Sequence, residues 1–233
     1  MRNTFDRFNG RHQDYQAARP SYAQEFLDWL GELYAPPERY TAADIGSGTG
    51  KLSAQLLAAG FRVCGVEPNP DMRGAAEALL GGDPRFSSSN GTDHDTGLPD
   101  RSVDMVAAAQ AFHWFDGPSF ARECRRILRP GGRAVLVWNV RGSAPMNQAL
   151  AQVFREHCPS FHGFTGGMGE DDPRIRDFFG GAYEKRRFPN PLTLDRDQFL
   201  RRCFSSSYAL REGDADYEAF RAALEALFDT FAS

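Results

Sequence analysis

The segment AADIGSGTGK, residues 42–51, constrains the fold more than any other part of this sequence. It continues an apolar run, and its glycines at 46, 48 and 50 allow the backbone to turn sharply and to approach a ligand that any Cβ would obstruct. The next residues, KLSAQLLAAG at 51–60, have helical periodicity and end on a glycine at a C-terminal cap position. The segment therefore predicts a strand, a tight ligand-facing turn and a helix.

The alternation of strand and helix continues along the chain to about residue 140. Strands that alternate with helices indicate a parallel sheet covered on both faces. We therefore expect an α/β fold: a doubly wound, mostly parallel, Rossmann-like sheet with an N-terminal lid helix and inserted elements after the fifth strand. The expected strands are 40–46, 61–67, 85–91, 102–110 and 132–140, and the expected helices between them are 51–60, 69–80 and 118–128.

Further elements are expected at both ends of the chain. Apolar residues recur at helical spacing over 23–34, and two prolines then stop the pattern. The glycine- and proline-rich stretch 159–173 is typical of a long irregular loop. Helices are expected at 144–158 and 214–232, and a strand at 183–189 with a helical stretch after it.

Composition and charge exclude several classes of function. The net charge of -4 gives no reason to expect nucleic acid, whose recognition leaves a basic footprint. The N-terminal sequence lacks the apolar core of a signal peptide, and no apolar run is long enough to cross a membrane. The four cysteines form no C-x-x-C pair, which favours a reduced, cytoplasmic protein without a metal site.

Two residues of the glycine segment distinguish between classes of nucleotide ligand. The dinucleotide fingerprint G-x-G-x-x-G needs glycine or alanine at position 51, where this chain has Lys51, and the P-loop pattern is missing as well. Asp44 lies two residues before the first glycine, where an anion suits an ammonium group better than a pyrophosphate. The segment therefore favours a ligand that carries a positive group.

An acidic residue at the end of the second expected strand completes this pattern. Glu67 follows Gly46 by about 20 residues, the usual distance to an acid that accepts both hydroxyls of a ribose. A ribose partner and an ammonium partner together predict an adenosine-type nucleoside without phosphates, which describes S-adenosylmethionine. The alternative is that Asp44 and Glu67 are ordinary polar residues at strand ends.

Four segments in this order resemble the sequential motifs of the class I S-adenosylmethionine-dependent methyltransferases, within the type 11 group. They are ADIGSGTGK, GVEPNPDM, GLPDRSVDMVAAAQAFHWFD and ECRRILRPGGRAVLVWN, and they cover roughly residues 41–140. The pattern YxxxRPxY, which begins at Tyr15, and the sequence HWFD are similar to the subgroup that includes trans-aconitate methyltransferase-like enzymes. The resemblance implies an enzyme with S-adenosylmethionine as its cofactor.

The resemblance also implies roles for residues at matching positions. Gly46, Ser47, Gly48 and Gly50 would lie against the methionine portion of the cofactor, Asp44 near its ammonium group and Glu67 at its ribose. Asn69 and Met72 would line the adenine side, and Gln110 would also bind the cofactor. Tyr15 and Arg19 would close over the cofactor, although a surface ion pair is an equal alternative for Arg19. The expected single domain, 1–233, then divides into a lid and helix at 1–35, a cofactor-binding core at 41–140 and acceptor-side elements at 141–233.

The sequence departs from the family pattern in two places. After the third strand, many relatives have an acidic residue where this chain has His94, so only a backbone contact from Asp93 and a weak role for Thr92 are carried over. The family sheet has the strand order 3-2-1-4-5-7-6. The segment 183–189 can supply the sixth strand, but no seventh follows the last helix. We expect a six-stranded sheet, a partner that covers the gap, or a seventh strand from another segment.

His113 lies in the aromatic stretch QAFHWFD, just beyond the fourth strand. Ligands bind at this carboxyl edge in open α/β sheets, so we expect His113 in the acceptor pocket as a wall residue, a general base or a structural residue. Trp114 and Phe115 would shape the same pocket. Trp138, Asn139 and Arg141 follow the fifth strand at the same edge, and Arg141 could hold an acceptor carboxylate or be exposed to solvent.

These observations predict methyl transfer to a small-molecule acceptor, on oxygen, with a carboxylate favoured. Two alternatives stay open: a non-catalytic S-adenosylmethionine-binding regulatory module, and a nicotinamide-dependent oxidoreductase, against which Lys51 argues. We expect neither a nucleic acid nor a membrane as partner. Both a monomer and a homodimer fit the sequence.

Overall fold

The computed structural model describes residues 20–165 and 168–232 of the chain. Their backbone contacts divide into two compact units. The first comprises Ser21–Asn139 and Gly169–Asn190, and the second comprises Val140–Met168 and the residues from Pro191 onward. We describe each unit by itself, and the expected single domain over 1–233 stays a prediction.

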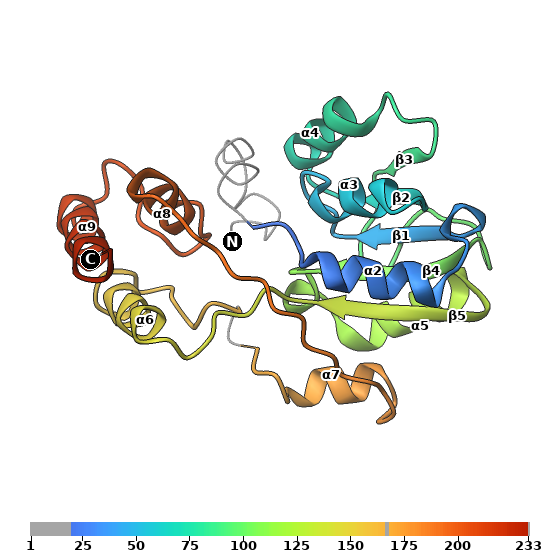
Figure 1. Cartoon of the computed structure of the whole chain (residues 1–233). Helices are drawn as coiled ribbons and strands as arrows, with labels where there is room; N and C mark the ends of the chain where they lie inside the picture. The colour runs from blue at the N-terminus through green and yellow to red at the C-terminus, as the bar shows by residue number, and fades with distance from the viewer. Residues whose placement is uncertain (1–19, 166–167, 233) are drawn as a thin grey trace. The chain divides into compact units, whose positions relative to one another are not determined.

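The first unit is built on a parallel sheet of five strands in the order β3-β2-β1-β4-β5 (Figure 1). Ala43 in β1 pairs with Cys64 on one side and with Val106 on the other, so β1 is central. All five strands overlap the predicted ranges, which confirms the α/β fold, although β5 begins at Leu128, four residues before the range expected for it. Their bounds are β1 Thr41–Ile45, β2 Arg62–Val66, β3 Phe86–Ser89, β4 Val103–Ala109 and β5 Leu128–Val137.

The helices α2 (Gln24–Leu33) and α3 (Lys51–Ala58) pack on one face of this sheet. Their leucines and phenylalanines meet alternate β4 residues, such as Met105 and Ala107, in one buried cluster. Helix α4 (Pro70–Leu80) follows β2 and begins at Asn69, whose side chain accepts hydrogen bonds from the backbone N–H groups of Asp71 and Met72. The side chain of Asn69 therefore caps the helix.

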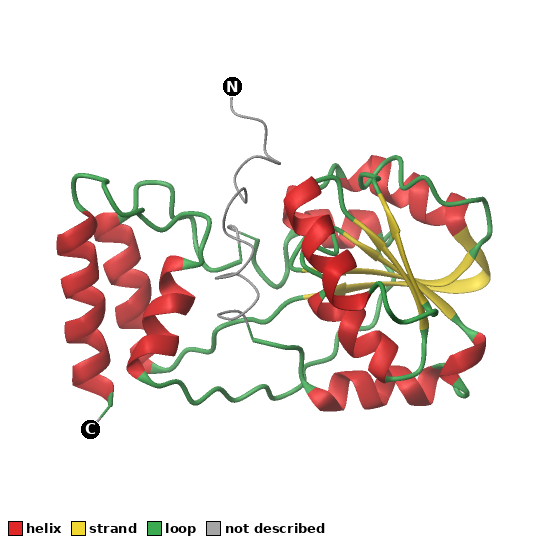
Figure 2. Cartoon of the chain, turned by 90° about the horizontal axis from the view of Figure 1, so that it is seen from above, coloured by secondary structure: helices red, strands yellow, loops and turns green. Residues whose placement is uncertain are grey.

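Helices cover the other face too, as Figure 2 shows. Helix α5 (Gly117–Ile127) starts at Asp116, whose carboxylate accepts a hydrogen bond from the N–H of Ser119. The short helix α7 (Pro173–Phe178) packs on α5, where the rings of Phe178 and Phe120 stack with centroids 5.1 Å apart. The sequence does not predict α7, because its six residues are too few to show a helical period.

The expected sixth strand at 183–189 is wrong. Among the described residues the sheet ends at β5, and 183–189 has no strand pairing. Lys185 and Arg187 instead form ion pairs with Glu170, and the ring of Phe188 lies against those of Phe26 and Trp29 on α2. Charge pairing and one aromatic anchor therefore hold the segment where a backbone ladder was expected.

The second unit contains three helices, α6 (Pro145–His157), α8 (Arg196–Phe204) and α9 (Tyr217–Phe231). Their apolar faces form a separate core in which Phe154 and Phe220 are fully buried. The ring of Phe154 contacts four other aromatic rings of the unit: Phe161, Phe164, Tyr208 and Phe220. This unit therefore has a hydrophobic core of its own.

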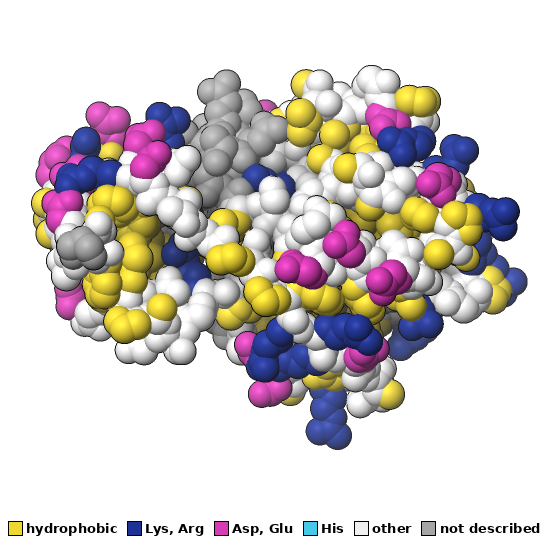
Figure 3. Space-filling model, in the orientation of Figure 1, with side chains coloured by type: hydrophobic (Ala, Val, Ile, Leu, Met, Phe, Trp, Pro, Cys, Tyr) yellow, Lys and Arg dark blue, Asp and Glu magenta, His cyan; other side chains and the backbone are white. Residues whose placement is uncertain are grey.

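Two surface properties follow from the elements described. In residues 20–165 and 168–232, no helix combines the length and the apolar character needed to cross a membrane. On the face of the molecule in Figure 3, acidic and basic side chains are interspersed. Ion pairs form between side chains of exposed segments of the chain, such as Lys185 with Glu170 and Arg174 with Asp172.

Candidate functional site

The candidate site lies at the carboxyl edge of the sheet, where the strand order reverses. Chain connections run from β1 toward β2 on one side and return to β4 on the other, which makes this edge the topological switch point. The register places Ile45 beside Val66 and Asp44 beside Ala107, so the ends of β1, β2 and β4 come together. The segments that follow these three strands contain most of the site residues that the sequence predicts.

The glycine loop after β1 has three residues with positive φ: Gly46 at 69°, Gly48 at 56° and Gly50 at 81°. A Cβ on Gly46 would lie 2.8 Å from the Cβ of Ala111 and 3.1 Å from the ring of Phe115, and one on Gly50 would meet Leu80 at 2.9 Å. A Cβ on Gly48 would meet nothing within 4 Å. Gly46 and Gly50 are therefore required by packing within the protein, whereas Gly48 borders open space.

Asp44 is 1% exposed, directly below this loop. Its Oδ2 accepts a hydrogen bond of 2.7 Å from the hydroxyl of Ser53, one turn into α3. Burial raises the pKa of Asp44 to about 6, although the hydrogen bonds from Ser53 act in the opposite direction. A carboxylate in such surroundings gains most from a cation that approaches it.

Glu67, the residue after β2, is a second buried carboxylate in the site. Its two oxygens accept hydrogen bonds of 2.9 Å from the backbone N–H groups of Gly48 and Asn69. Burial raises the pKa of Glu67, while these two N–H groups lower it. The carboxylate of Glu67 thus joins the glycine loop to the start of α4 and can accept further hydrogen bonds at the free lone pairs of both oxygens.

The site contains buried polar atoms without a partner. Asp44 Oδ1 and Thr49 Oγ1 have no hydrogen-bond partner among the described residues. Buried polar atoms are nearly always paired, so such atoms beside open space are expected where a ligand binds. The site fits a nucleoside with a positively charged group. Asp44 offers an unpaired hydrogen-bond acceptor, Gly48 borders open space, and Glu67 stands where an acid usually binds a ribose.

Arg73 supports the far side of the site. Its guanidinium donates to the carbonyl of Glu67 at 2.8 Å and to the side-chain oxygen of Asn90 at 3.0 Å, so it joins the ends of β2 and β3. Asn69 and Met72 are buried beside it, and the amide oxygen of Asn69 is used in capping α4.

The loop after β3 is joined to the aromatic motif through Asp93. One carboxylate oxygen of Asp93 accepts a hydrogen bond from the backbone N–H of Asp116, and the other lies 3.1 Å from Nδ1 of His94. The hydroxyl of Thr92 accepts a hydrogen bond from the N–H of Asp95, which closes a local turn. Asp93 therefore holds two loops together, which the sequence does not predict.

The aromatic motif after β4 divides into buried and accessible residues. Phe112 is fully buried against the rings of Phe120, Phe178 and Trp138. Phe115 packs against Phe120 and lies over Gly46. His113 is half-buried beside Trp114, which is 38% exposed. Of the motif, His113 and Trp114 are therefore accessible to a ligand, and Phe112 and Phe115 support the glycine loop from below.

Gln110 and the residues after β5 complete this edge. Gln110 has a φ of 54°, a left-handed conformation that is costly for a residue with a side chain and is concentrated at functional sites. Its amide donates to the carbonyl of Asn139, and Asn139 is in turn bonded to Ser21 and Asn190. The buried Nε1 of Trp138 has no hydrogen-bond partner among the described residues.

Three predicted site residues are not part of this group. Tyr15 and Arg19 lie outside the described residues. Arg141 belongs to the second unit, where its guanidinium lies 4.5 Å from the ring centroid of Phe164.

The prediction from sequence missed several residues of the site. Ser53 could have been predicted from its position, because a side chain in the first turn of α3 points back toward the end of β1, where it donates to Asp44. Thr49 and Arg73 give no signal of their own, because loops and exposed helix faces commonly contain threonine and arginine. The bonds that join Ser21, Asn139 and Asn190 span 51 to 169 residues of sequence and could not have been predicted from local patterns.

Comparisons with known proteins agree with this geometry. Residues 43–136 match the family described as a methyltransferase domain. An uncharacterized methyltransferase of Mycobacterium tuberculosis is 42% identical over 127 residues, which are 54% of this chain and 49% of the relative. A methyltransferase-like protein of Schizosaccharomyces pombe is 29% identical over 213 residues, 87% of this chain and 79% of its own.

The solved structure of a putative type II methyltransferase from Anaeromyxobacter dehalogenans is similar over nearly the whole chain. Its TM-score is 0.59 at 29% identity, with 91% of this chain and 90% of that chain covered. The chain spans about half the length of the first curated relatives that it matches, 49%.

We predict that alanine at Gly46 and at Gly48 has different effects. Both substitutions place a side chain at positive φ, which costs roughly 1–2 kcal/mol. Gly46→Ala also overlaps Ala111 and Phe115, so it should lower the free energy of unfolding by clearly more, measured by urea denaturation. Gly48→Ala meets no protein atom, so its main effect should be weaker binding of S-adenosylmethionine, measured by calorimetry. Equal loss of stability in both variants would contradict this division.

Proposed function

We propose that this chain, a member of the class I S-adenosylmethionine-dependent methyltransferases, transfers a methyl group from S-adenosylmethionine to a small-molecule acceptor. The observation that carries the proposal is the pair of buried carboxylates, Asp44 and Glu67, on either side of the glycine loop. The unpaired Oδ1 of Asp44 supports an ammonium partner, and the position of Glu67 at the end of β2 supports a ribose partner.

Several residues of this chain would hold the cofactor. Asp44 would pair with its ammonium group, and Glu67 would accept the ribose hydroxyls. Gly48 would allow the methionine portion close to the backbone, because no atom of the described residues lies within 4 Å of the position of its missing Cβ. The other residues proposed here are Tyr15, Arg19, Gly46, Ser47, Gly50, Asn69, Met72, Thr92, Asp93 and Gln110.

Bound S-adenosylmethionine supplies a methyl group already activated on a sulfonium. The protein is then required mainly to align donor and acceptor, to exclude water and, for some acceptors, to remove a proton. Phe112 and Phe115 fix the glycine loop by packing, which keeps the donor side of the site in one position. His113 and Trp114 are the accessible residues of the same motif and would contact the acceptor.

We further propose methylation on oxygen, with a carboxylate as the favoured acceptor. Support comes from the similarity of HWFD to the trans-aconitate methyltransferase-like subgroup and from an arginine, Arg141, in the segment after β5. A carboxylate needs no base, so His113 would serve as a pocket wall. Trp138 and Asn139 are proposed for the same pocket. The four free cysteines support a cytoplasmic location.

The first test is binding and turnover. Purified protein should bind S-adenosylmethionine and S-adenosylhomocysteine in calorimetry and release S-adenosylhomocysteine with an acceptor from a panel of small acids. Glu67→Ala should reduce the affinity for both ligands by about tenfold or more, because hydrogen bonds to a buried charged group are lost. Glu32→Ala, at an exposed position of α2, is the matched control and should bind as the wild type does. A folded protein that binds neither ligand would refute the proposal, whereas binding without turnover would favour a non-catalytic module.

The second prediction concerns pH. Because the pKa of Asp44 is raised to about 6 in the absence of ligand, only about a tenth of the protein has this carboxylate ionised at pH 5. The affinity for S-adenosylmethionine should therefore fall about tenfold between pH 7.5 and pH 5, measured by calorimetry. Asp44→Asn should bind weakly at both pH values and lose most of this dependence. The pH dependence of affinity that remains in Asp44→Asn is attributed to Glu67, whose pKa is also raised.

The same raised pKa of Asp44 has a defined effect on stability without ligand. Between its ordinary pKa of 3.8 and about 6, the native state holds this proton more tightly than the unfolded state. The contribution of Asp44 to the free energy of unfolding therefore falls as the pH rises through this range.

The binding measurement decides the role of Asp44 in the site. An affinity for S-adenosylmethionine that does not change from pH 5 to pH 7.5 would contradict this role.

The third prediction separates two roles of His113. If the acceptor is a carboxylate, His113→Ala should lower kcat by less than about tenfold, because no proton has to be removed. Affinity for S-adenosylmethionine should stay within about twofold, since Asp44 and Glu67 hold the cofactor. A fall in kcat of about a hundredfold or more, with the basic limb of the pH profile lost, would instead identify His113 as a general base.

A further inference from the structure

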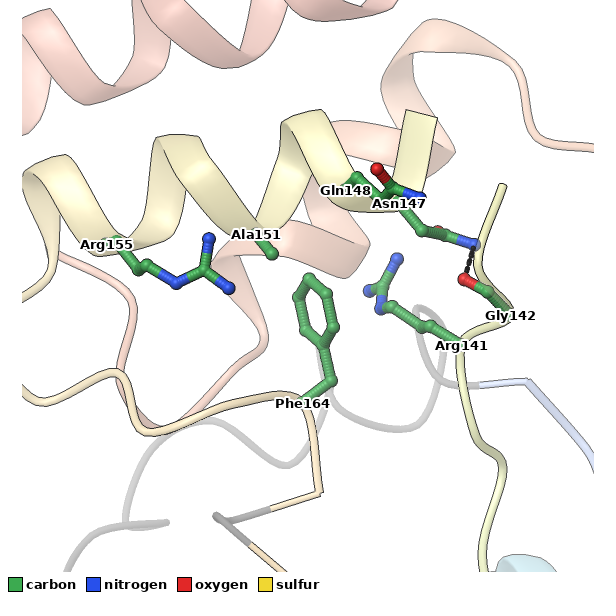
Figure 4. A pocket seen from close by; sticks show the side chains of 7 residues that line it. All are labelled: Arg141, Gly142, Asn147, Gln148, Ala151, Arg155 and Phe164. Carbon is green, nitrogen blue, oxygen red and sulfur yellow. Dashed lines mark hydrogen bonds between the residues drawn. The ribbon is translucent and has the colours of Figure 1, made fainter. Parts of the chain in front are cut away.

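The second unit contains a pocket of about 330 Å³ under the first turns of α6 (Figure 4). Its walls include Asn147, Gln148 and Arg155 from α6, Arg141 from the segment before that helix, and Phe164 from the loop after it. Gln148 and Arg155 are seven residues apart, so they lie on one face of the helix. The lining residues that the structure describes all belong to the second unit.

The charge of this α6 pocket is positive. Two guanidinium groups line it, and no acidic side chain does so among the residues that the structure describes. Arg155 forms no ion pair among the described residues, and its side chain contacts Gln152 at 3.3 Å. The pocket also borders the N-terminal end of a helix of 13 residues, whose dipole adds a positive potential. An anion is therefore the ligand that the pocket favours electrostatically.

The remaining walls indicate what kind of anion fits. In Figure 4 the ring of Phe164 lies between the guanidinium groups of Arg141 and Arg155, and Arg141 lies over it with Cζ 4.5 Å from the centroid. The side-chain amides of Asn147 and Gln148 each donate one hydrogen to a backbone carbonyl, Gly142 and Ser143, and retain a second donor. An aromatic wall suits a carbon skeleton, and guanidinium groups suit the planar fork of a carboxylate.

We propose that the α6 pocket binds a small organic carboxylate, with Arg155 and Arg141 contacting the carboxylate and Phe164 packing against the carbon skeleton. An organic acid fits these walls better than inorganic phosphate does, because phosphate has no carbon skeleton to pack against the ring of Phe164. A volume of about 330 Å³ is at the small end for ligand pockets, which limits the acid to the size of a metabolite.

Such an acid has one of two origins: it is the methyl acceptor, an origin that rests on the proposed function, or it is an effector that binds without being methylated. The binding site itself does not rest on the proposed function, because it needs neither the cofactor nor turnover. The two sources share the same chemistry and are separated below by whether the acid is converted to its methyl ester.

The test uses benzoate, its neutral isostere benzamide, and inorganic phosphate as probes of the full-length protein, by calorimetry without cofactor. Benzoate should bind, and benzamide and phosphate should bind at least about tenfold more weakly. Arg155→Gln should weaken benzoate binding by about tenfold or more. Arg155→Lys should weaken it by less, because lysine keeps the positive charge and loses only the bidentate geometry of the guanidinium group. Arg221→Gln on α9, whose arginine pairs with Glu225, is the matched control in the same unit and should bind benzoate as the wild type does.

Each outcome decides the proposal. Equal binding of benzoate and benzamide, phosphate binding as tight as benzoate, unchanged binding in Arg155→Gln, or no binding of benzoate at all would overturn it. Thermal denaturation of each variant shows whether a loss of binding reflects unfolding. Addition of S-adenosylmethionine and mass spectrometry for methyl benzoate then distinguish acceptor from effector. Failure of S-adenosylmethionine binding would refute the proposed function while leaving the benzoate result intact.

Discussion

The close approach of the glycine loop to the segment after β4 is the constraint on which the site depends. Gly46 lies so near Ala111 and Phe115 that a side chain there would overlap them, and its N–H bonds to Val66 at the end of β2. The loop is thus fixed at once by the ends of β2 and β4, the two strands that flank β1. This fixed position lets Gly48 present its backbone to open space and Glu67 reach the N–H of Gly48. Packing behind the loop and ligand access in front of it are two consequences of one arrangement.

Burial of two carboxylates at this edge costs stability unless a partner compensates for the lost hydration. The protein supplies part of this compensation through Ser53 for Asp44, and through two backbone N–H groups for Glu67. The compensation is incomplete, since the pKa of both groups remains raised. A ligand with an ammonium group and ribose hydroxyls would provide what is missing. The two buried carboxylates therefore lower the stability of the ligand-free protein and raise its affinity for a ligand, a common property of binding sites.

The sequence predicted those parts of the structure that local signals determine. The five strands and the glycine loop each follow from residues within one short window. The role of Phe115 could not be predicted, because only the folded chain brings its ring over Gly46. The expected strand at 183–189 failed for a similar reason: its alternation of charged and apolar residues suits a strand, but ion pairs with Glu170 and the anchor at Phe188 decide its path. The periodicity of a sequence does not reveal contacts between distant segments. These contacts determine which residues of a motif face a ligand.

The charges of the two units are complementary to the two reactants of the proposed reaction. The first unit buries carboxylates where a cationic cofactor would bind, and the second lines its pocket with guanidinium groups that suit an anion. Transfer of a methyl group from a sulfonium to a carboxylate removes a positive and a negative charge together. Water stabilises the separated charges of the reactants more than the dispersed charge of the transition state, so excluding water favours the transfer. A carboxylate acceptor needs no base for this chemistry, and under the proposed function His113 would then form part of the pocket wall.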